Sequence, residues 1–176
     1  MRSRVLYSLC ISGLLLACAR GARSTPSSSE VSFDSEPVQP CTEHSKAPMG
    51  EKHVILTEES GAPHFSSTKV TVHAGKTVYF VSKVNQDQCI GLADGGILAN
   101  GGILLADGGI VSGDDNPLRV PACQVAFWTL KSTDTKGPPV DWWSCPSDGG
   151  CSGCTQPKVI AETIKGTLEV TSGVGP

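Results

Sequence analysis

The sequence predicts a mainly β domain, an antiparallel sandwich or barrel, and three observations support this fold class. Residues 69–73 alternate between polar and apolar side chains, and residues 77–81 are β-branched or aromatic throughout. Ala74-Gly75-Lys76 between them is a turn. Further short runs of strand-forming residues, separated by proline and glycine, lie at 53–57, 124–131, 140–143 and 166–171. Short strands at this spacing are typical of sandwiches and barrels, and the only helix expected is a turn or two near residues 159–164.

The first residues have the pattern of an export signal. Arg2 and Arg4 precede a short apolar run that ends in Leu15-Leu16-Ala17-Cys18. These four residues resemble the lipobox of bacterial lipoproteins, which implies a signal peptide of residues 1–17, cleavage before Cys18 and lipidation of Cys18. An ordinary signal peptide cut after Ala19 or Ala22 is the alternative. A retained transmembrane helix is excluded, because residues 5–19 fall short of the ~20 apolar residues that a span needs.

A lipid on Cys18 would anchor the chain in the membrane of a bacterial cell envelope. Ala19, rather than an aspartate, follows Cys18, which by resemblance to lipoprotein sorting favours the outer membrane. Residues 18–47 are rich in serine and proline and predict a disordered tether, followed by a domain of residues 48–174. Without residues 1–17 the chain has 12 basic and 17 acidic side chains, a formal charge of −5. This charge argues against a nucleic-acid partner and leaves the membrane and an envelope protein as expected partners.

Six cysteines remain once Cys10 leaves with the signal peptide and Cys18 carries lipid. They are Cys41, Cys89, Cys123, Cys145, Cys151 and Cys154. In an oxidising compartment an even number of cysteines normally forms disulfides, each worth about 2 to 4 kcal/mol. Their pairing cannot be read from the sequence.

Two segments carry a resemblance to a known family. Residues 70–81 (Val-Thr-Val-His-Ala-Gly-Lys-Thr-Val-Tyr-Phe-Val), and Trp143-Ser144-Cys145 followed by residues 164–170, resemble the strand–turn–strand and the closing segment of cupredoxins. The resemblance implies a Greek-key β-sandwich that, in functional members, holds copper for electron transfer, with a thiolate ligand at Cys145. The remaining ligands do not match: Ile164 stands in place of the axial methionine, and the neighbourhood of Cys89 replaces the first histidine. No histidine follows Cys145, since all four lie earlier, at His44, His53, His64 and His73.

We therefore expect a cupredoxin-like domain without a bound cofactor. The alternative is a copper-binding or electron-transfer protein in which Cys145 acts with atypical ligands such as Cys89 or His73. The spacing of Cys145, Cys151 and Cys154 also resembles the cluster loop of two-iron ferredoxins, and zinc could use the same thiolates. Disulfides are favoured over both, because exported thiols are normally oxidised.

A glycine-rich repeat interrupts the strand pattern. Three similar units, residues 93–98, 99–104 and 106–111, predict a Gly-rich insertion of residues 92–116 between two strands of the sandwich. Their Asp-Gly and Asn-Gly pairs favour tight turns. Calcium binding is the less favoured explanation of the aspartates, which are Asp94, Asp107, Asp114 and Asp115. Display of the insertion for adhesion or partner binding is the functional alternative.

Single residues add little. Trp128, Trp142 and Trp143 are expected to pack in the core beside a disulfide rather than to form a sugar or peptide platform. His64 and His73 are expected to be solvated. Because no nucleophile elbow, phosphate loop or zinc-protease motif occurs, we expect no enzyme. The predicted function is a lipid-anchored, non-catalytic binding or structural module.

Overall fold

The computed structural model describes residues 37–113, 116–147, 150–156 and 165–173, which lie in one unit of the chain, residues 35–176. The predicted signal peptide, Cys18, Asp114, Asp115 and the short helix near 159–164 lie outside the described residues. The described part consists of strands and one short 3-10 helix, Gly95–Ile97. The strands are β1 (Lys52–Glu59), β2 (Ala62–Phe65), β3 (Lys69–His73), β4 (Thr77–Ser82), β5 (Gln88–Leu92), β6 (Leu98–Leu104), β7 (Ile110–Ser112), β8 (Leu118–Val120), β9 (Val125–Leu130), β10 (Val140–Pro146) and β11 (Lys165–Thr171).

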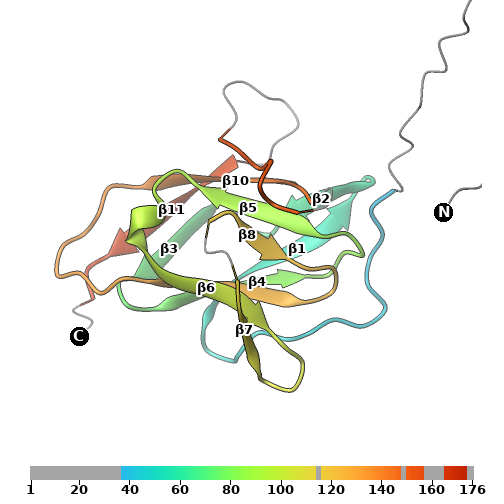
Figure 1. The fold of residues 1–176 in the computed structure, drawn as a ribbon, viewed down its shortest axis with the longest axis horizontal. Coiled ribbons are helices and arrows are strands. Elements are labelled where there is room, and N and C mark those ends of the chain that lie inside the picture. Colours follow the sequence, from blue (N-terminus) through green and yellow to red (C-terminus); the bar gives the residue numbers. More distant parts are fainter. Residues whose placement is uncertain (1–36, 114–115, 148–149, 157–164, 174–176) are drawn as a thin grey trace, which may run out of the picture. The chain divides into compact units, whose positions relative to one another are not determined.

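The strands form two sheets of a sandwich (Figure 1). The six-stranded sheet has the order β2-β1-β4-β9-β6-β7, and the five-stranded sheet has the order β3-β11-β10-β5-β8. The predicted fold class, a mainly β sandwich, is confirmed. The sheets are mixed rather than antiparallel throughout, because β1 pairs with β4 and β3 pairs with β11 in parallel. The turn at 74–76 joins β3 in one sheet to β4 in the other, and turn residues alone do not specify which strands pair.

The core lies between the two sheets. Alternate residues of the strands fill it, among them Val54 and Leu56 of β1, which are fully buried. Trp128 and Trp142 are each 1% exposed, and the ring of Phe80 lies 5.0 Å from Trp128 and 6.3 Å from Trp142 in edge-to-face contact. The core position expected for these two tryptophans is confirmed.

The glycine-rich segment forms the last two strands of the six-stranded sheet, β6 and the edge strand β7. β6 lies between β9 and β7, and Gly102 is buried with its backbone against the carbonyl of Val111. The Ile and Leu positions beside the glycines supply short strands, as expected of this repeat, and the turn after β6 and all three residues of β7 are exposed. Asp94 accepts a hydrogen bond from the Gly96 amide, and Asp107 accepts one from the Gly109 amide, both at 2.9 Å. These aspartates therefore have the predicted turn role.

Part of the predicted tether packs on the domain. Val38 is buried, and Pro40 forms an isolated bridge with Val84. The amide of Cys41 donates to the carbonyl of Lys83 at 2.8 Å, and the amide of Ser45 donates to the carbonyl of Cys123 at 3.0 Å. Residues 37–50, which we call the N-terminal strap, lie along the six-stranded sheet, so the domain begins earlier than residue 48 (Figure 1). Composition alone did not show this, because the strap contributes few apolar side chains.

None of the helical structure found in the described residues is long or apolar enough to cross a membrane.

Candidate functional site

The candidate site lies on the five-stranded sheet, where β5 and β10 run side by side. Cys89 of β5 and Cys145 of β10 are direct partners in this antiparallel pair. Side chains that are opposite one another in such a pair point to the same face of the sheet. Because Ile90, the neighbour of Cys89, packs in the core, both cysteines lie on the face turned away from the core.

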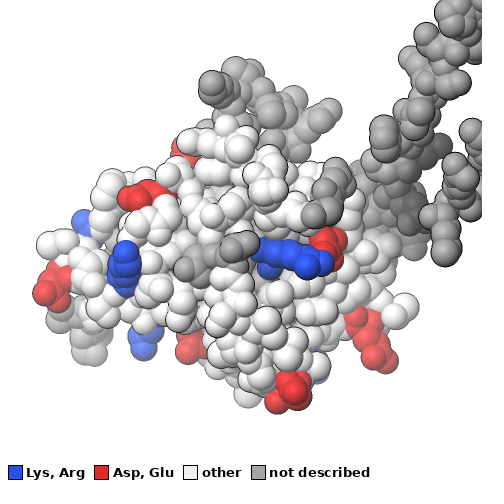
Figure 2. Space-filling view, viewed as in Figure 1, with Lys and Arg blue, Asp and Glu red and all other residues white. Residues whose placement is uncertain are grey.

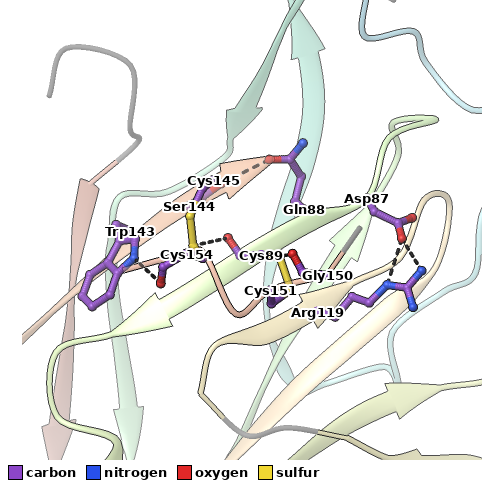
Figure 3. The surroundings of a disulfide bond; sticks show 10 residues. All are labelled: Asp87, Gln88, Cys89, Arg119, Trp143, Ser144, Cys145, Gly150, Cys151 and Cys154. Atoms are coloured by element: carbon purple, nitrogen blue, oxygen red, sulfur yellow. Dashed lines mark hydrogen bonds and ion pairs between the residues drawn. A yellow bond between two sulfur atoms is a disulfide. The ribbon is translucent and has the colours of Figure 1, made fainter. Parts of the chain in front are cut away.

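Each of these two cysteines is bonded to one end of the same short turn (Figure 3). Cys89 pairs with Cys151, with 5.4 Å between their Cα atoms, and Cys145 pairs with Cys154, with 5.9 Å. The amide of Cys154 donates to the carbonyl of Cys151 at 3.0 Å, which closes the Cys-x-x-Cys turn. Two adjacent strands are thus tied covalently to the two ends of one turn, an arrangement that we call the double staple.

The third disulfide lies elsewhere in the domain. It joins Cys41 of the N-terminal strap to Cys123, which precedes β9, with 5.8 Å between the Cα atoms. The disulfide bonds that the sequence predicts are present, and they use all six of the cysteines expected in the mature chain.

Trp143 lies beneath the double staple. It is 5% exposed and packs with Cys89 and Cys154, and its indole N–H donates to the carbonyl of Cys154 at 3.4 Å. Its ring crosses Gly91, where an added Cβ would lie only 2.4 Å from an indole carbon. The position expected for Trp143, beside a disulfide, is confirmed, and glycine at 91 is what allows the ring to lie so close to the sheet.

An ion pair borders the double staple. Asp87 accepts hydrogen bonds from the guanidinium of Arg119 and, through its other oxygen, from the amide of Ala122 at 2.8 Å (Figure 3). The carbonyl of Asp87 accepts from the amide of Ser147 at 3.2 Å. Asp87 therefore ties together the start of β5, strand β8 and the chain leaving β10.

Two polar side chains are buried on the opposite face of the same strands. Gln88 is fully buried and Ser144 is 4% exposed. The hydroxyl of Ser144 donates to Oε1 of Gln88 at 3.4 Å, and Nε2 of Gln88 donates to Oε1 of Gln86 at 3.2 Å. These partners satisfy the hydrogen-bonding groups of Gln88, so its burial is explained by structure.

The copper hypothesis built on Cys145 required a free thiol there. In the structure Cys145 is bonded to Cys154 and Cys89 to Cys151, so neither sulfur is a thiolate, and the proposed ligand pair is overturned. The same bonds remove the three thiolates of the ferredoxin and zinc hypotheses. Within the described residues, no group of three or more His, Cys, Asp or Glu side chains is arranged to hold a metal ion.

The remaining histidine candidates lie apart from the double staple. His73 is exposed on β3, at the edge of the five-stranded sheet, with Nδ1 2.8 Å from the hydroxyl of Thr171. His64 is exposed on β2 and lies 3.4 Å from a carboxylate oxygen of Glu59. Both are solvated, as the sequence predicts.

Comparisons with known proteins reveal a likeness of fold. No protein-family model and no curated protein sequence matches the chain. A solved structure of an oxidised amicyanin variant is 11% identical, over 77% of this chain and 99% of its own, with a TM-score of 0.39. Auracyanin B is 17% identical, over 77% of this chain and 98% of its own, with a TM-score of 0.32. The multicopper oxidase McoA from the hyperthermophile Aquifex aeolicus is 8% identical over 74% of this chain and 32% of its own, with a TM-score of 0.39.

Amicyanin and auracyanin are cupredoxins. At these identities and TM-scores, nothing about a metal or an activity of this chain follows from the likeness.

Sequence reasoning missed the double staple itself. The cysteines were identified, but their pairing depends on the register of β5 and β10, and β5 was not predicted. The sequence holds one signal of this arrangement. Cys151 and Cys154 are separated by only two residues, so each of them can bond to a cysteine on a different one of two neighbouring strands.

Proposed function

We propose that this chain is an exported bacterial lipoprotein, anchored through Cys18 in the cell envelope, on the outer membrane. Its disulfide-stapled β-sandwich acts as a non-catalytic binding or structural module without copper. The observation that carries this proposal is the pairing of all six cysteines that remain after Cys10 and Cys18 are removed, since such pairing requires an oxidising compartment.

The anchor is tested by metabolic labelling. The full chain is produced in a bacterium with two membranes that is fed an alkyne-tagged fatty acid. The outer-membrane fraction is then analysed by mass spectrometry. We expect label on the wild type and on Cys10→Ser, the matched control, and none on Cys18→Ser. An unlabelled wild type whose mature chain begins after Ala19 or Ala22 would overturn the lipid anchor in favour of an ordinary signal peptide.

The metal-free state is tested on the exported protein. Thiol labelling under native conditions should find no reactive cysteine in the mature domain, and copper titration should produce no intense visible absorption. A reactive thiol at Cys145 that gains such absorption with copper would contradict the proposal.

A second candidate function is the binding of an envelope protein through the glycine-rich segment, and the exposure of its strand β7 favours it. The hairpin of β6 and β7 projects from the sandwich (Figure 1), and in Figure 2 this projection has few charged side chains. Ile110 is 64% exposed and Val111 is 46% exposed, and both belong to β7, the edge strand of the six-stranded sheet. An exposed apolar edge strand can pair with a strand of another protein.

The other sheet edges in the described structure are protected. β2 contains Pro63, β3 begins with Lys69 in an ion pair with Glu169, and β8 contains Arg119. Charges and proline are the usual means of preventing edge pairing. β7, with the sequence Ile-Val-Ser, has neither.

The edge-strand function is tested by photo-crosslinking in cells. A photoreactive residue in place of Ile110 is expected to capture one envelope protein, and the same residue in place of Ala62, exposed on the protected edge β2, is the matched control. Val111→Lys should reduce the capture from position 110. Equal products from both positions, or none from 110, would remove this candidate.

A further inference from the structure

The double staple places four sulfur atoms where they can be joined in a second way. We propose that Cys89, Cys145, Cys151 and Cys154 form a thiol–disulfide exchange site, at which a small thiol of the cell envelope converts the two staples into a Cys89–Cys145 bond and a Cys151–Cys154 bond. This goes beyond the binding or structural role proposed above, because it gives the domain a reactive site.

The first alternative bond connects β5 to β10 directly. Cys89 and Cys145 are register partners in the antiparallel pair and lie on the same face. Residues directly opposite one another in such a pair have Cα atoms about 4.5 to 5.5 Å apart. This separation is within the range of about 4.4 to 6.8 Å that disulfides span. The backbone therefore holds these two cysteines at bonding distance whether or not they are bonded.

The second alternative bond closes the turn on itself. The hydrogen bond of 3.0 Å from the amide of Cys154 to the carbonyl of Cys151 makes these residues the two ends of a β-turn. The ends of such a turn have Cα atoms less than about 7 Å apart. Cys154 Sγ also lies 3.7 Å from the carbonyl oxygen of Cys89, so the turn is seated directly against β5.

Solvent access differs between the sulfurs and selects the one that is attacked. Cys89 is fully buried and Cys154 is 5% exposed, whereas Cys151 and Cys145 are half-buried. A hollow of about 310 Å³ reaches Cys151 and is lined in part by Gly150 and Arg119. Cys151 is thus the position at which an external thiolate enters.

The exchange balances without an added oxidant or reductant. A thiolate RS⁻ attacks Sγ of Cys151, forms an RS–Cys151 bond and expels the thiolate of Cys89. The Cys89 thiolate attacks Sγ of Cys145, forms the cross-strand bond and expels the thiolate of Cys154. The Cys154 thiolate then attacks Sγ of Cys151, closes the turn disulfide and returns RS⁻. The site has two disulfides before the exchange and two after it, and RS⁻ is returned, so the external thiol is a catalyst.

The exchange would release the turn from both strands. In the stapled form the turn covers Trp143, which donates a hydrogen bond to the carbonyl of Cys154. After the exchange the turn has no covalent tie to β5 and is held by hydrogen bonds and packing alone. Water can then reach the indole of Trp143, whereas Trp128 and Trp142 remain buried in the core.

The experiment uses the full exported chain with its free thiols blocked during lysis. The protein is incubated under native conditions with a reduced and oxidised glutathione buffer, quenched with acid, and its disulfides are mapped by mass spectrometry at intervals. We expect Cys89–Cys145 and Cys151–Cys154 peptides to appear, and the tryptophan emission to shift to longer wavelength. Trp143→Phe should abolish the shift and leave the exchange intact.

The Cys41–Cys123 bond is the internal control. Both of its cysteines are half-buried as well, but no other disulfide lies beside it. The double staple should lose its original pairing at least about tenfold faster than the Cys41–Cys123 bond does. In a Cys145→Ser/Cys154→Ser variant, the Cys89 thiolate can attack only Sγ of Cys151, so the Cys89–Cys151 bond should re-form, glutathione should leave, and no new disulfide should appear.

Two results would overturn the proposal. One is that the original pairs persist although isotopically labelled glutathione is found bonded to Cys151, which shows that the buffer thiol reaches this sulfur. The other is that all three disulfides are lost together, which would show that exchange requires unfolding of the whole domain. Neither result touches the test of the lipid anchor or of the metal-free state.

Discussion

At the scale of single residues, Gly91 determines how closely Trp143 lies on the five-stranded sheet. An added Cβ at Gly91 would lie 2.4 to 2.6 Å from three indole atoms. Gly91→Ala should therefore displace the ring and destabilise the domain by about 1 to 3 kcal/mol, as overpacked core positions do, measured by urea unfolding. Gly113→Ala is the matched control, since an added Cβ there meets nothing within 4 Å. Equal urea midpoints for the two variants would contradict this account of Gly91.

Glu169 gives a prediction on pH dependence. Nζ of Lys69 lies 2.9 Å from a carboxylate oxygen of Glu169, and the hydrogen bond from Lys69, aided by its charge, lowers the pKa of Glu169 below its usual value. A carboxyl with a lowered folded pKa stabilises the fold fully above its unfolded pKa and loses that contribution as the pH falls through the folded pKa. Glu169→Gln should therefore have a slightly lower urea midpoint than wild type at neutral pH and the same midpoint at about pH 2. A difference that persists in acid would show that Glu169 acts through packing instead.

At the scale of elements, the N-terminal strap is held by hydrogen bonds to residues 83–85 and, at Cys123, by a disulfide and a further hydrogen bond. The backbone of Cys123 has φ of 59°, in the left-handed region, its amide donates to the carbonyl of Val84 at 3.0 Å, and its carbonyl accepts from Ser45. The Cys41→Ser/Cys123→Ser variant should lose about 2 to 4 kcal/mol of stability, because this disulfide closes a long loop of chain. We also expect proteases to cut residues 37–50 in this variant first, as limited proteolysis with mass spectrometry would show. If the strap stays resistant to proteolysis, its hydrogen bonds suffice to hold it.

The strands that the sequence predicted share a clear signal, and those that it missed lack it. β3 matches its predicted bounds and β4 is longer by Ser82 alone, because polar and apolar residues alternate in β3 and β-branched and aromatic residues make up most of β4. The sequence predicts only short strand pieces within β6, and Gly101 and Gly102 disfavour strands by intrinsic preference. Its strand is imposed by tertiary pairing, with Gly102 opposite Phe127 and Ile103 opposite Ala126 in β9. Local propensity cannot report a partner that lies elsewhere in the sequence.

The candidate site was predictable in its residue types but not in its geometry. An even number of cysteines and an export signal are properties of composition, and they led to the expectation of disulfides. The pairing of Cys89 with Cys151 and of Cys145 with Cys154 depends on the register between β5 and β10. That register is set by core residues such as Ile90 and Trp142, which point to the opposite face. A sequence pattern therefore identifies the sulfurs, and only the packed sandwich decides which of them meet.

At the scale of the whole molecule, stability and compartment are linked through the three disulfides. They join the strap to the start of β9 and the Cys-x-x-Cys turn to two strands of the other sheet, so both sheets carry a staple. We expect the exported chain to unfold at a clearly higher urea concentration than a form that lacks residues 2–17 and is made in a reducing cytoplasm. Each disulfide should contribute about 2 to 4 kcal/mol. Circular dichroism gives the midpoints, and oxidation of the cytoplasmic form in vitro should raise its midpoint to that of the exported form. If the reduced form is as stable as the exported one, the packing of the two sheets around Trp128 and Trp142 would suffice for folding, and the disulfides would have to be explained by the exchange chemistry at Cys151 alone.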